Sequence, residues 1–203
     1  MMIRKLSLFF GLLALSAGAA LGGVEVGQQA PDFNLPDTNG KTHQLSEYKG
    51  KYVVLEWYNP DCPFVRKHYG SGNMQSLQKE FTAKGVVWLS VDSSAPGQEG
   101  NYPAAKLNEI ASSQGAARTA LLLDPDGRVG HEYGAKTTPD MYIINPEGKL
   151  IYEGAIDNKA STVVADLKIA TNYVKVALDS SMAGKGVSQT VTRPYGCSVK
   201  YAQ

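Results

Sequence analysis

The stretch that decides the fold covers residues 51–62 and reads KYVVLEWYNPDC. Residues 51–58 are β-branched, aromatic and almost continuously apolar, which is typical of a strand buried on both faces. Residues 59–61 (Asn-Pro-Asp) end this strand, and residues 62–69 predict the first turns of a helix with Asp61 as its N-cap. The sequence therefore predicts a buried strand, a short loop and a helix that begins at Cys62.

Cys62 at this position has the features of a reactive thiol. Unpaired backbone N–H groups and the helix dipole at a helix N-terminus favour the thiolate, which is the nucleophilic form of cysteine. Arg66, four residues later and on the same helix face, would add positive charge, whereas the carboxylate of Asp61 would raise the pKa of the thiol. A buried, unreactive cysteine is the alternative that these residues leave open.

Strand-like and helix-like segments alternate along the rest of the chain. Helices are predicted over residues 73–85, 103–113 and 160–178, the last with Val163, Val164, Leu167, Ala170 and Val174 on one side. Strands are predicted over residues 86–91 and 119–123, and a closing hairpin over 141–144 and 149–152. This pattern predicts an α/β fold with a mixed central sheet and helices on both faces. One domain would cover residues 23–182, followed by a tail, residues 183–203, that carries Cys197.

The first 22 residues have the layout of a secretory signal peptide. Arg4 and Lys5 precede the apolar run at residues 6–15, and small residues follow. Cleavage would fall after Ala19 or Gly22, and an uncleaved membrane anchor is the alternative. We therefore expect an exported protein without a membrane segment after cleavage. A bacterial periplasm is the expected compartment, where a disulfide can persist.

Composition excludes several classes of protein. Hydrophobic residues make up 43% of the 203 residues and charged residues 19%, which is enough apolar material for a core. The formal net charge is +1 and no long run of like charge occurs, so we expect no nucleic-acid partner. His43, His68 and His131 are scattered, so we expect neither a metal site nor a cofactor.

Three segments together resemble thioredoxin-like redoxins of the AhpC/TSA type. Residues 54–63 (VLEWYNPDCP) resemble their strand-loop-helix, with two aromatics before a reactive cysteine, and residues 30–41 resemble their opening. Residues 137–140 (Thr-Thr-Pro-Asp) resemble the loop whose proline is cis and packs against that cysteine. The resemblance implies a thioredoxin-like fold and a cis bond before Pro139. The alternative is an ordinary trans proline at the start of a strand.

The same resemblance implies a set of substrate-binding residues around the cysteine. The backbone of Thr138 and Pro139 would face an extended partner chain. Four further residues flank the cysteine in sequence and would form the core and rim of its site; they are Trp57, Tyr58, Pro63 and Phe64.

Glu56 is an acid inside an otherwise apolar strand, where burial is costly unless the carboxyl group is protonated or paired. It lies six residues before Cys62, the offset at which thioredoxins keep a buried acid that handles a proton, so the resemblance implies a general base. The alternative is that Glu56 reaches Lys51 or Lys84 and has only a structural role.

The chain also departs from its relatives. Thioredoxins use Cys-x-x-Cys, but the second cysteine is replaced here by Val65. Peroxiredoxins place a proline and a threonine or serine where this chain has Leu55 and Asn59, and their later active-site arginine is missing. Without a second cysteine at position 65, thiol–disulfide exchange within the motif is impossible. Without the peroxiredoxin residues, we do not expect peroxidase chemistry by the usual route.

Cys197 gains importance from this departure. Similar redoxins carry a comparable Gly-Cys tail, so the resemblance implies that Cys197 folds back as the resolving thiol of Cys62. A permanent structural disulfide and an unpaired or intermolecular Cys197 are the two alternatives.

The sequence thus predicts an exported thiol–disulfide oxidoreductase. Cys62 would attack a protein disulfide or a peroxide, Arg66 would stabilise the thiolate, Glu56 would move a proton and Cys197 would resolve the mixed species. A separate thiol partner would act as reductant. The alternatives are a peroxiredoxin-like thiol peroxidase and a non-catalytic peptide-binding domain with a structural Cys62–Cys197 disulfide.

Overall fold

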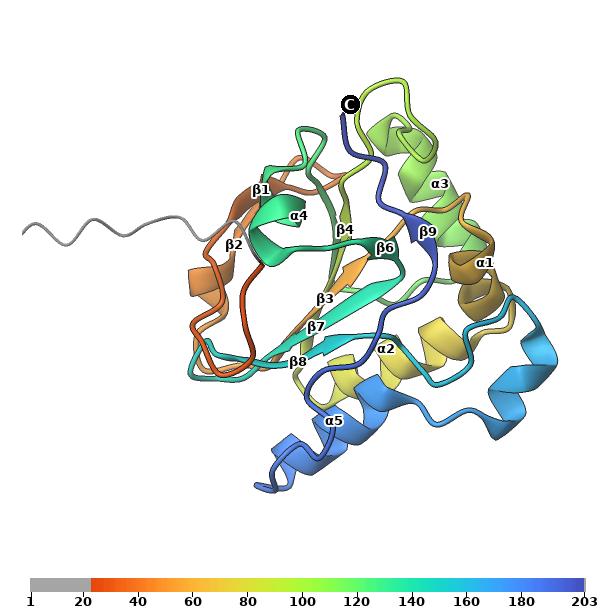
Figure 1. Ribbon diagram of the computed structural model, residues 1–203. Coiled ribbons are helices and arrows are strands. Elements are labelled where there is room, and N and C mark those ends of the chain that lie inside the picture. The colour runs from red at the N-terminus through yellow and green to blue at the C-terminus, as the bar shows by residue number, and fades with distance from the viewer. Residues whose placement is uncertain (1–22, 203) are drawn as a thin grey trace, which may run out of the picture.

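The computed structural model of the chain describes residues 23–202 (Figure 1). The predicted signal peptide at residues 1–22 lies outside the described residues. Among the helices of residues 23–202, none is long and apolar enough to cross a bilayer.

A five-stranded mixed sheet forms the centre of the molecule, in the order β5-β4-β3-β7-β8. β3 and β4 are parallel, as are β4 and β5, whereas β7 runs antiparallel to both β3 and β8. The strands are β3 (Val53–Trp57), β4 (Val87–Asp92), β5 (Ala120–Leu123), β7 (Asp140–Ile144) and β8 (Leu150–Gly154). All residues of β3, β4 and β7 are buried, which explains why these strands are mostly apolar.

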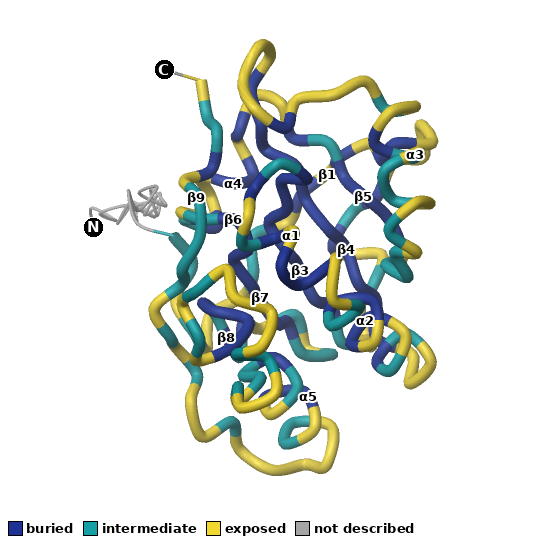
Figure 2. Tube along the Cα trace, turned by 90° about the vertical axis from the view of Figure 1, so that its right-hand side faces the viewer, coloured by how far each residue is buried: buried dark blue, intermediate teal, exposed yellow. Residues whose placement is uncertain are grey.

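Helices cover both faces of the sheet, as the sequence predicts. On one face lie α1 (Pro63–Gly70), α2 (Asn73–Ala83), α3 (Ala104–Gln114) and α5 (Tyr173–Met182), which share a core cluster with Cys62. On the other lie α4 (Arg128–Tyr133), β1 (Asn34–Pro36), β2 (Thr42–Gln44) and the 3-10 helix η1 (Leu45–Tyr48). Figure 2 shows the buried strands at the centre and the exposed outer sides of the helices.

The predicted helix over residues 160–178 is wrong. The structure has a 3-10 helix there, η2 (Val164–Ile169), and a separate α5 that begins after Asn172. Val163 and Val164 are 54% and 52% exposed, Leu167 and Ala170 are half-buried, and only Val174 of the expected apolar side is buried. The Asn172 side chain accepts a hydrogen bond from the backbone of Lys175 at 2.9 Å, which explains why α5 begins there.

The start of α1 also differs from the prediction. Cys62, not Asp61, occupies the N-cap position, with φ −65° and ψ 124°. The Asp61 carboxylate instead accepts hydrogen bonds from Arg66 at 2.6 Å and from the Tyr102 hydroxyl at 2.7 Å. Side-chain pairing across the loop therefore replaces the expected cap. The short helix α4 is a further element that the sequence pattern did not predict.

The C-terminal arm, which we define as residues 190–201, returns from α5 to the sheet (Figure 1). It follows β8, where Thr192 donates its backbone N–H to Glu153 at 3.0 Å. It then forms β9 (Cys197–Ser198), which pairs antiparallel with β6 (Thr137–Thr138) just before β7. The arm thus brings Cys197 to the end of the sheet at which Cys62 lies.

Candidate active site

Cys62 is fully buried where β3 leads into α1. Its side chain is 0% exposed, and its thiol donates a hydrogen bond to the carbonyl oxygen of Thr138 at 2.9 Å. The backbone carbonyl of Cys62 accepts the N–H of Arg66 at 2.9 Å, the first turn of α1. The hydrophobic strand, the Pro60 loop and the helix start thus position the thiol as the sequence predicts.

Cys197 reaches Cys62 through the pairing of β6 with β9. In that register Cys197 lies opposite Thr138, the residue whose carbonyl accepts the Cys62 thiol. The peptide bond between Thr138 and Pro139 is cis, which confirms the expectation from the resemblance. Both cysteines are free thiols in this structure, and each interacts with the other. One short strand pair therefore joins all four residues into one site.

The two thiols differ in acidity. Burial raises the pKa of Cys62, but hydrogen bonds that the Cys197 thiol and the Val65 backbone N–H donate to the thiolate outweigh it, so the pKa lies below its ordinary value. Burial, together with the hydrogen bond and charge of Cys62, raises the pKa of Cys197 to about 12. The negative charge of the pair therefore resides on Cys62, which makes its sulfur the more nucleophilic of the two.

Arg66 does not point to the thiol as the sequence predicted. Its guanidinium donates to the Pro60 carbonyl at 3.0 Å and to the Asp61 carboxylate at 2.6 Å, with the side chain 61% exposed. This pair neutralises Asp61, whose charge would otherwise oppose a thiolate at the next residue.

Glu56 is buried and accepts hydrogen bonds from four side chains. The donors are Trp88 at 2.8 Å, Tyr69 and Ser90 at 2.9 Å, and Gln78 at 3.3 Å. The alternative in which Glu56 reaches Lys51 or Lys84 is therefore wrong.

Arg118 is a second charged residue beside the side chains that bond to Glu56. It was not identified from the sequence. It donates to the Tyr69 hydroxyl at 3.2 Å and lies 4.5 Å from the ring of Tyr58. An arginine just before a strand is usually exposed, so no sequence pattern signals the burial of Arg118.

A polar group anchors the arm to α1. The Tyr195 hydroxyl donates to Asp157 at 2.6 Å, and its ring lies 5.8 Å from that of Phe64. His68 of α1 lies 3.3 Å from the same hydroxyl, and burial lowers the pKa of His68 to about 4, so this imidazole is neutral. Aromatic residues in a tail could have signalled such anchoring.

The other residues predicted to bind substrate divide between the two faces of the sheet. Tyr58 shares the core cluster of Cys62, and Phe64 packs against that cluster. Trp57 belongs to the opposite cluster, where its indole donates to Ser93 at 3.1 Å, so the structure does not bring it to the cysteines. Pro63 occupies the first position of α1, directly after Cys62.

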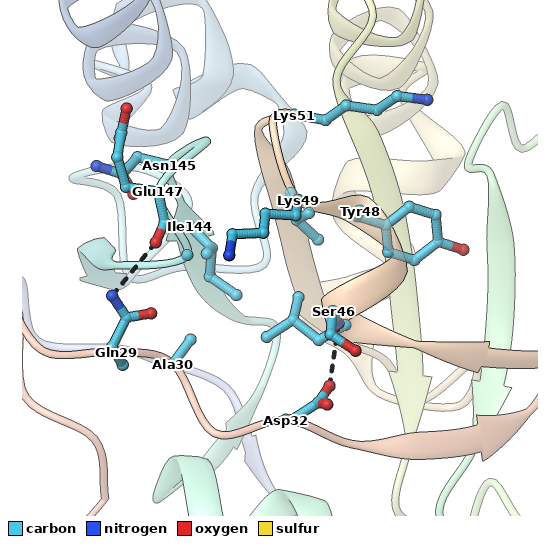
Figure 3. A pocket seen from close by; sticks show the side chains of 13 residues that line it. Gln29, Ala30, Asp32, Ser46, Tyr48, Lys49, Lys51, Ile144, Asn145 and Glu147 are labelled. Carbon is cyan, nitrogen blue, oxygen red and sulfur yellow. Dashed lines mark hydrogen bonds between the residues drawn. The ribbon is translucent and has the colours of Figure 1, made fainter.

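A separate pocket of about 350 Å³ opens at the other end of β3. Figure 3 shows its lining, where Gln29 bonds to the backbone of Glu147 and Asp32 to that of Ser46. Val53, at the N-terminal end of β3, also lines this pocket, whereas Cys62 lies beyond the C-terminal end of β3. This pocket is therefore distinct from the cysteine site.

Comparison with known proteins agrees with the fold. The family model described as AhpC/TSA family matches residues 26–153. The thiol-disulfide oxidoreductase ResA of Bacillus subtilis is 32% identical over 128 residues, which cover 63% of this chain and 66% of ResA. Peroxiredoxin Bcp of Bacillus subtilis is 53% identical over a shorter match of 38 residues, 19% of this chain and 24% of Bcp.

A solved structure shows the same fold. The thioredoxin domain of the thiol-disulfide oxidoreductase BVU-2223 from Bacteroides vulgatus superimposes with a TM-score of 0.52 at 19% identity, covering 72% of this chain and 98% of that domain. At this identity the likeness concerns the fold alone. With a family model that matches more than half of its length, the chain belongs to the AhpC/TSA family of thiol-dependent oxidoreductases and has its thioredoxin-like fold.

Proposed function

We propose that this protein is an exported thiol–disulfide oxidoreductase in which Cys62 and Cys197 form the redox pair. The observation that carries the proposal is the approach of Cys197 to a buried thiol whose pKa is lowered. Cys197 supplies the second thiol that position 65 lacks. Export rests on the sequence pattern of residues 1–22, and a bacterial periplasm suits a pair that must be oxidised as well as reduced.

In the proposed reaction, the Cys62 thiolate attacks one sulfur of a substrate disulfide. The substrate S–S bond breaks, and its second sulfur leaves as a thiolate that takes up a proton. Cys197 then attacks the Cys62 sulfur, so that the Cys62–Cys197 disulfide forms and the remaining substrate thiol is released. An external dithiol reductant returns the pair to two thiols and is itself oxidised.

The surrounding residues have supporting roles in this proposal. The carbonyl of Thr138 orients the Cys62 thiol, and Arg66 offsets the charge of Asp61. Glu56 moves a proton through its hydrogen-bonded group, which includes Tyr69.

Single-cysteine variants test the proposal. In an assay of disulfide reduction with a chemical dithiol as reductant, Cys62→Ser should abolish turnover. In the absence of the dithiol, reduced Cys197→Ser protein should stop at a mixed disulfide between Cys62 and the substrate, mapped by peptide mass. Turnover that survives in Cys62→Ser would refute the assignment, and peptide binding without any turnover would favour the non-catalytic alternative.

Peroxide reduction is the second candidate, favoured by the short but close match to peroxiredoxin Bcp. In that reaction Cys62 attacks the peroxide O–O bond, leaving a sulfenic acid on Cys62 and releasing water or an alcohol. Hydrogen peroxide added to Cys197→Ser, followed by a sulfenic-acid probe, distinguishes the two: a labelled Cys62 supports peroxidase chemistry, and an unlabelled one excludes it.

A further inference from the structure

The C-terminal arm occupies the strand edge beside Cys62. β9 pairs with β6 so that Cys197 lies opposite Thr138 and Ser198 opposite Thr137, and the N–H of Val199 donates to the carbonyl of Lys136 at 3.1 Å. An extended peptide that adds a strand to a sheet uses such backbone groups. In this protein the backbone groups of β6 already pair with β9 of the same chain. Figure 1 shows β9 lying beside β6.

The arm lies unusually close to this edge at Gly196. Its φ is +152°, and a Cβ at this position would overlap the carbonyl oxygen of Thr138. That oxygen is the one that accepts the Cys62 thiol. A glycine therefore allows the arm to pass directly over the site, and Cys62 is 0% exposed beneath it, whereas Cys197 stays partly exposed.

Two tyrosines hold the arm on either side of Cys197. Upstream, Tyr195 donates to the buried carboxylate of Asp157 at 2.6 Å. Downstream, Tyr201 donates to the carbonyl of Ala135 at 2.8 Å, and its ring stacks on His131 with the ring centroids 4.0 Å apart. The arm is thus held in place beside the two cysteines. A peptide strand that competes for the edge of β6 would have to break both tyrosine anchors as well as the β6–β9 pairing.

We propose that the arm takes the place of a peptide substrate and thereby restricts the redox pair to small-molecule disulfides. This inference rests on the proposed function and narrows its substrate class. A small disulfide needs only a local opening around the partly exposed Cys197, whereas an extended polypeptide needs the whole β6 edge. The chemistry is unchanged: the Cys62 thiolate breaks the S–S bond of the small disulfide, one thiol leaves, and attack by Cys197 on Cys62 releases the second.

The test compares two oxidants with the same reactive group. One is hydroxyethyl disulfide, and the other is a short unstructured peptide whose single cysteine carries 2-mercaptoethanol in a disulfide. Both react with Cys197→Ser protein, so that the reaction stops at the mixed disulfide on Cys62 and its rate is followed by mass. We expect the small disulfide to react faster by about tenfold or more, equivalent to about 1.4 kcal/mol in the barrier.

Glycine substitutions in the same tail show whether the arm causes this preference. Gly196→Ala, added to the Cys197→Ser protein, places a methyl group against Thr138 and should raise the peptide rate until the difference largely disappears. Gly186→Ala is the matched control, because a Cβ there meets open space, and it should preserve the difference. Tyr201→Ala removes the downstream anchor and should also raise the peptide rate. It tests the same inference if Gly196→Ala fails to fold.

The outcomes distinguish a failure of the small-disulfide preference from a failure of the redox role of Cys62. Equal rates for both oxidants in the parent protein would overturn the inference while leaving the redox pair intact. An unchanged preference in folded Gly196→Ala and Tyr201→Ala would overturn it as well. If neither oxidant modified Cys62, the proposed function itself would be refuted.

Discussion

Asp140, directly after Pro139, supports the loop that holds the active site. It is 2% exposed, and its carboxylate accepts the backbone N–H of Lys136 at 3.0 Å, on the strand edge that pairs with the arm. Burial raises the pKa of Asp140 to about 7, with the charge of Glu153 acting in the same direction. The hydrogen bonds from the backbone of Lys136 and Thr137 oppose this rise only in part.

Because the folded pKa exceeds the ordinary aspartate value of 3.8, protonated Asp140 favours the folded state. This contribution is complete below about pH 4 and is lost as the pH rises to about 7. The difference between the two pKa values corresponds to about 4 kcal/mol in the free energy of unfolding. In Asp140→Asn the side chain is neutral at every pH and can still accept an N–H bond, so this part of the pH dependence should disappear.

Urea unfolding of the reduced protein between pH 4 and 8, followed by the fluorescence of Trp57 and Trp88, measures the effect. The free energy of unfolding of the wild type should fall over this range by about 4 kcal/mol more than that of Asp140→Asn. Other groups titrate in both proteins, so their contributions to the pH dependence cancel in the difference between the two. Glu109→Gln, at a side chain 69% exposed, is the control and should follow the wild type. Parallel curves for wild type and Asp140→Asn would refute the reasoning.

Three further predictions follow from the site and the arm. Tyr195→Phe keeps the ring contact with Phe64 but removes one of the two hydrogen bonds to Asp157 Oδ1, leaving only that from the Lys159 N–H, so urea unfolding should show a loss of about 1.5–3 kcal/mol. Gly154→Ala introduces a Cβ that overlaps the Thr192 backbone at a φ of +126°, and calorimetry should show a lower Tm, unlike Gly186→Ala. Iodoacetamide labelling of Cys62 should show a pH midpoint below that of a free thiol, about 8.5, and Cys197→Ala should raise this midpoint because alanine has no donor for the Cys62 thiolate.

The centre of the fold could be predicted from sequence because its signals are local. An apolar run interrupted only by Glu56 predicts β3, and the Pro60 loop marks the start of α1 within one residue. The prediction over residues 160–178 failed although its apolar spacing was helical, because Val163 and Val164 have no neighbouring element to bury them. Periodicity shows which residues share a face but not whether that face meets a core.

The site itself could be predicted only in part, since its completion depends on contacts distant in sequence. Cys62 was identified from its position after a strand, but the approach of Cys197 depends on two short strands and on Gly196 lying against Thr138. Arg66 was expected at the thiol from helical spacing, yet the nearby Asp61 attracts it. Such competition between partners is invisible in a spacing pattern.

Equilibration of the mature protein with graded dithiol redox buffers tests the central claim most directly, with thiols trapped and mapped by peptide mass. The account predicts a Cys62–Cys197 disulfide that forms and breaks between about −120 and −270 mV, the range of exchange catalysts. A disulfide that persists below about −300 mV would be a structural bond and would contradict the redox role. Two thiols that never join at any potential would contradict the pairing itself.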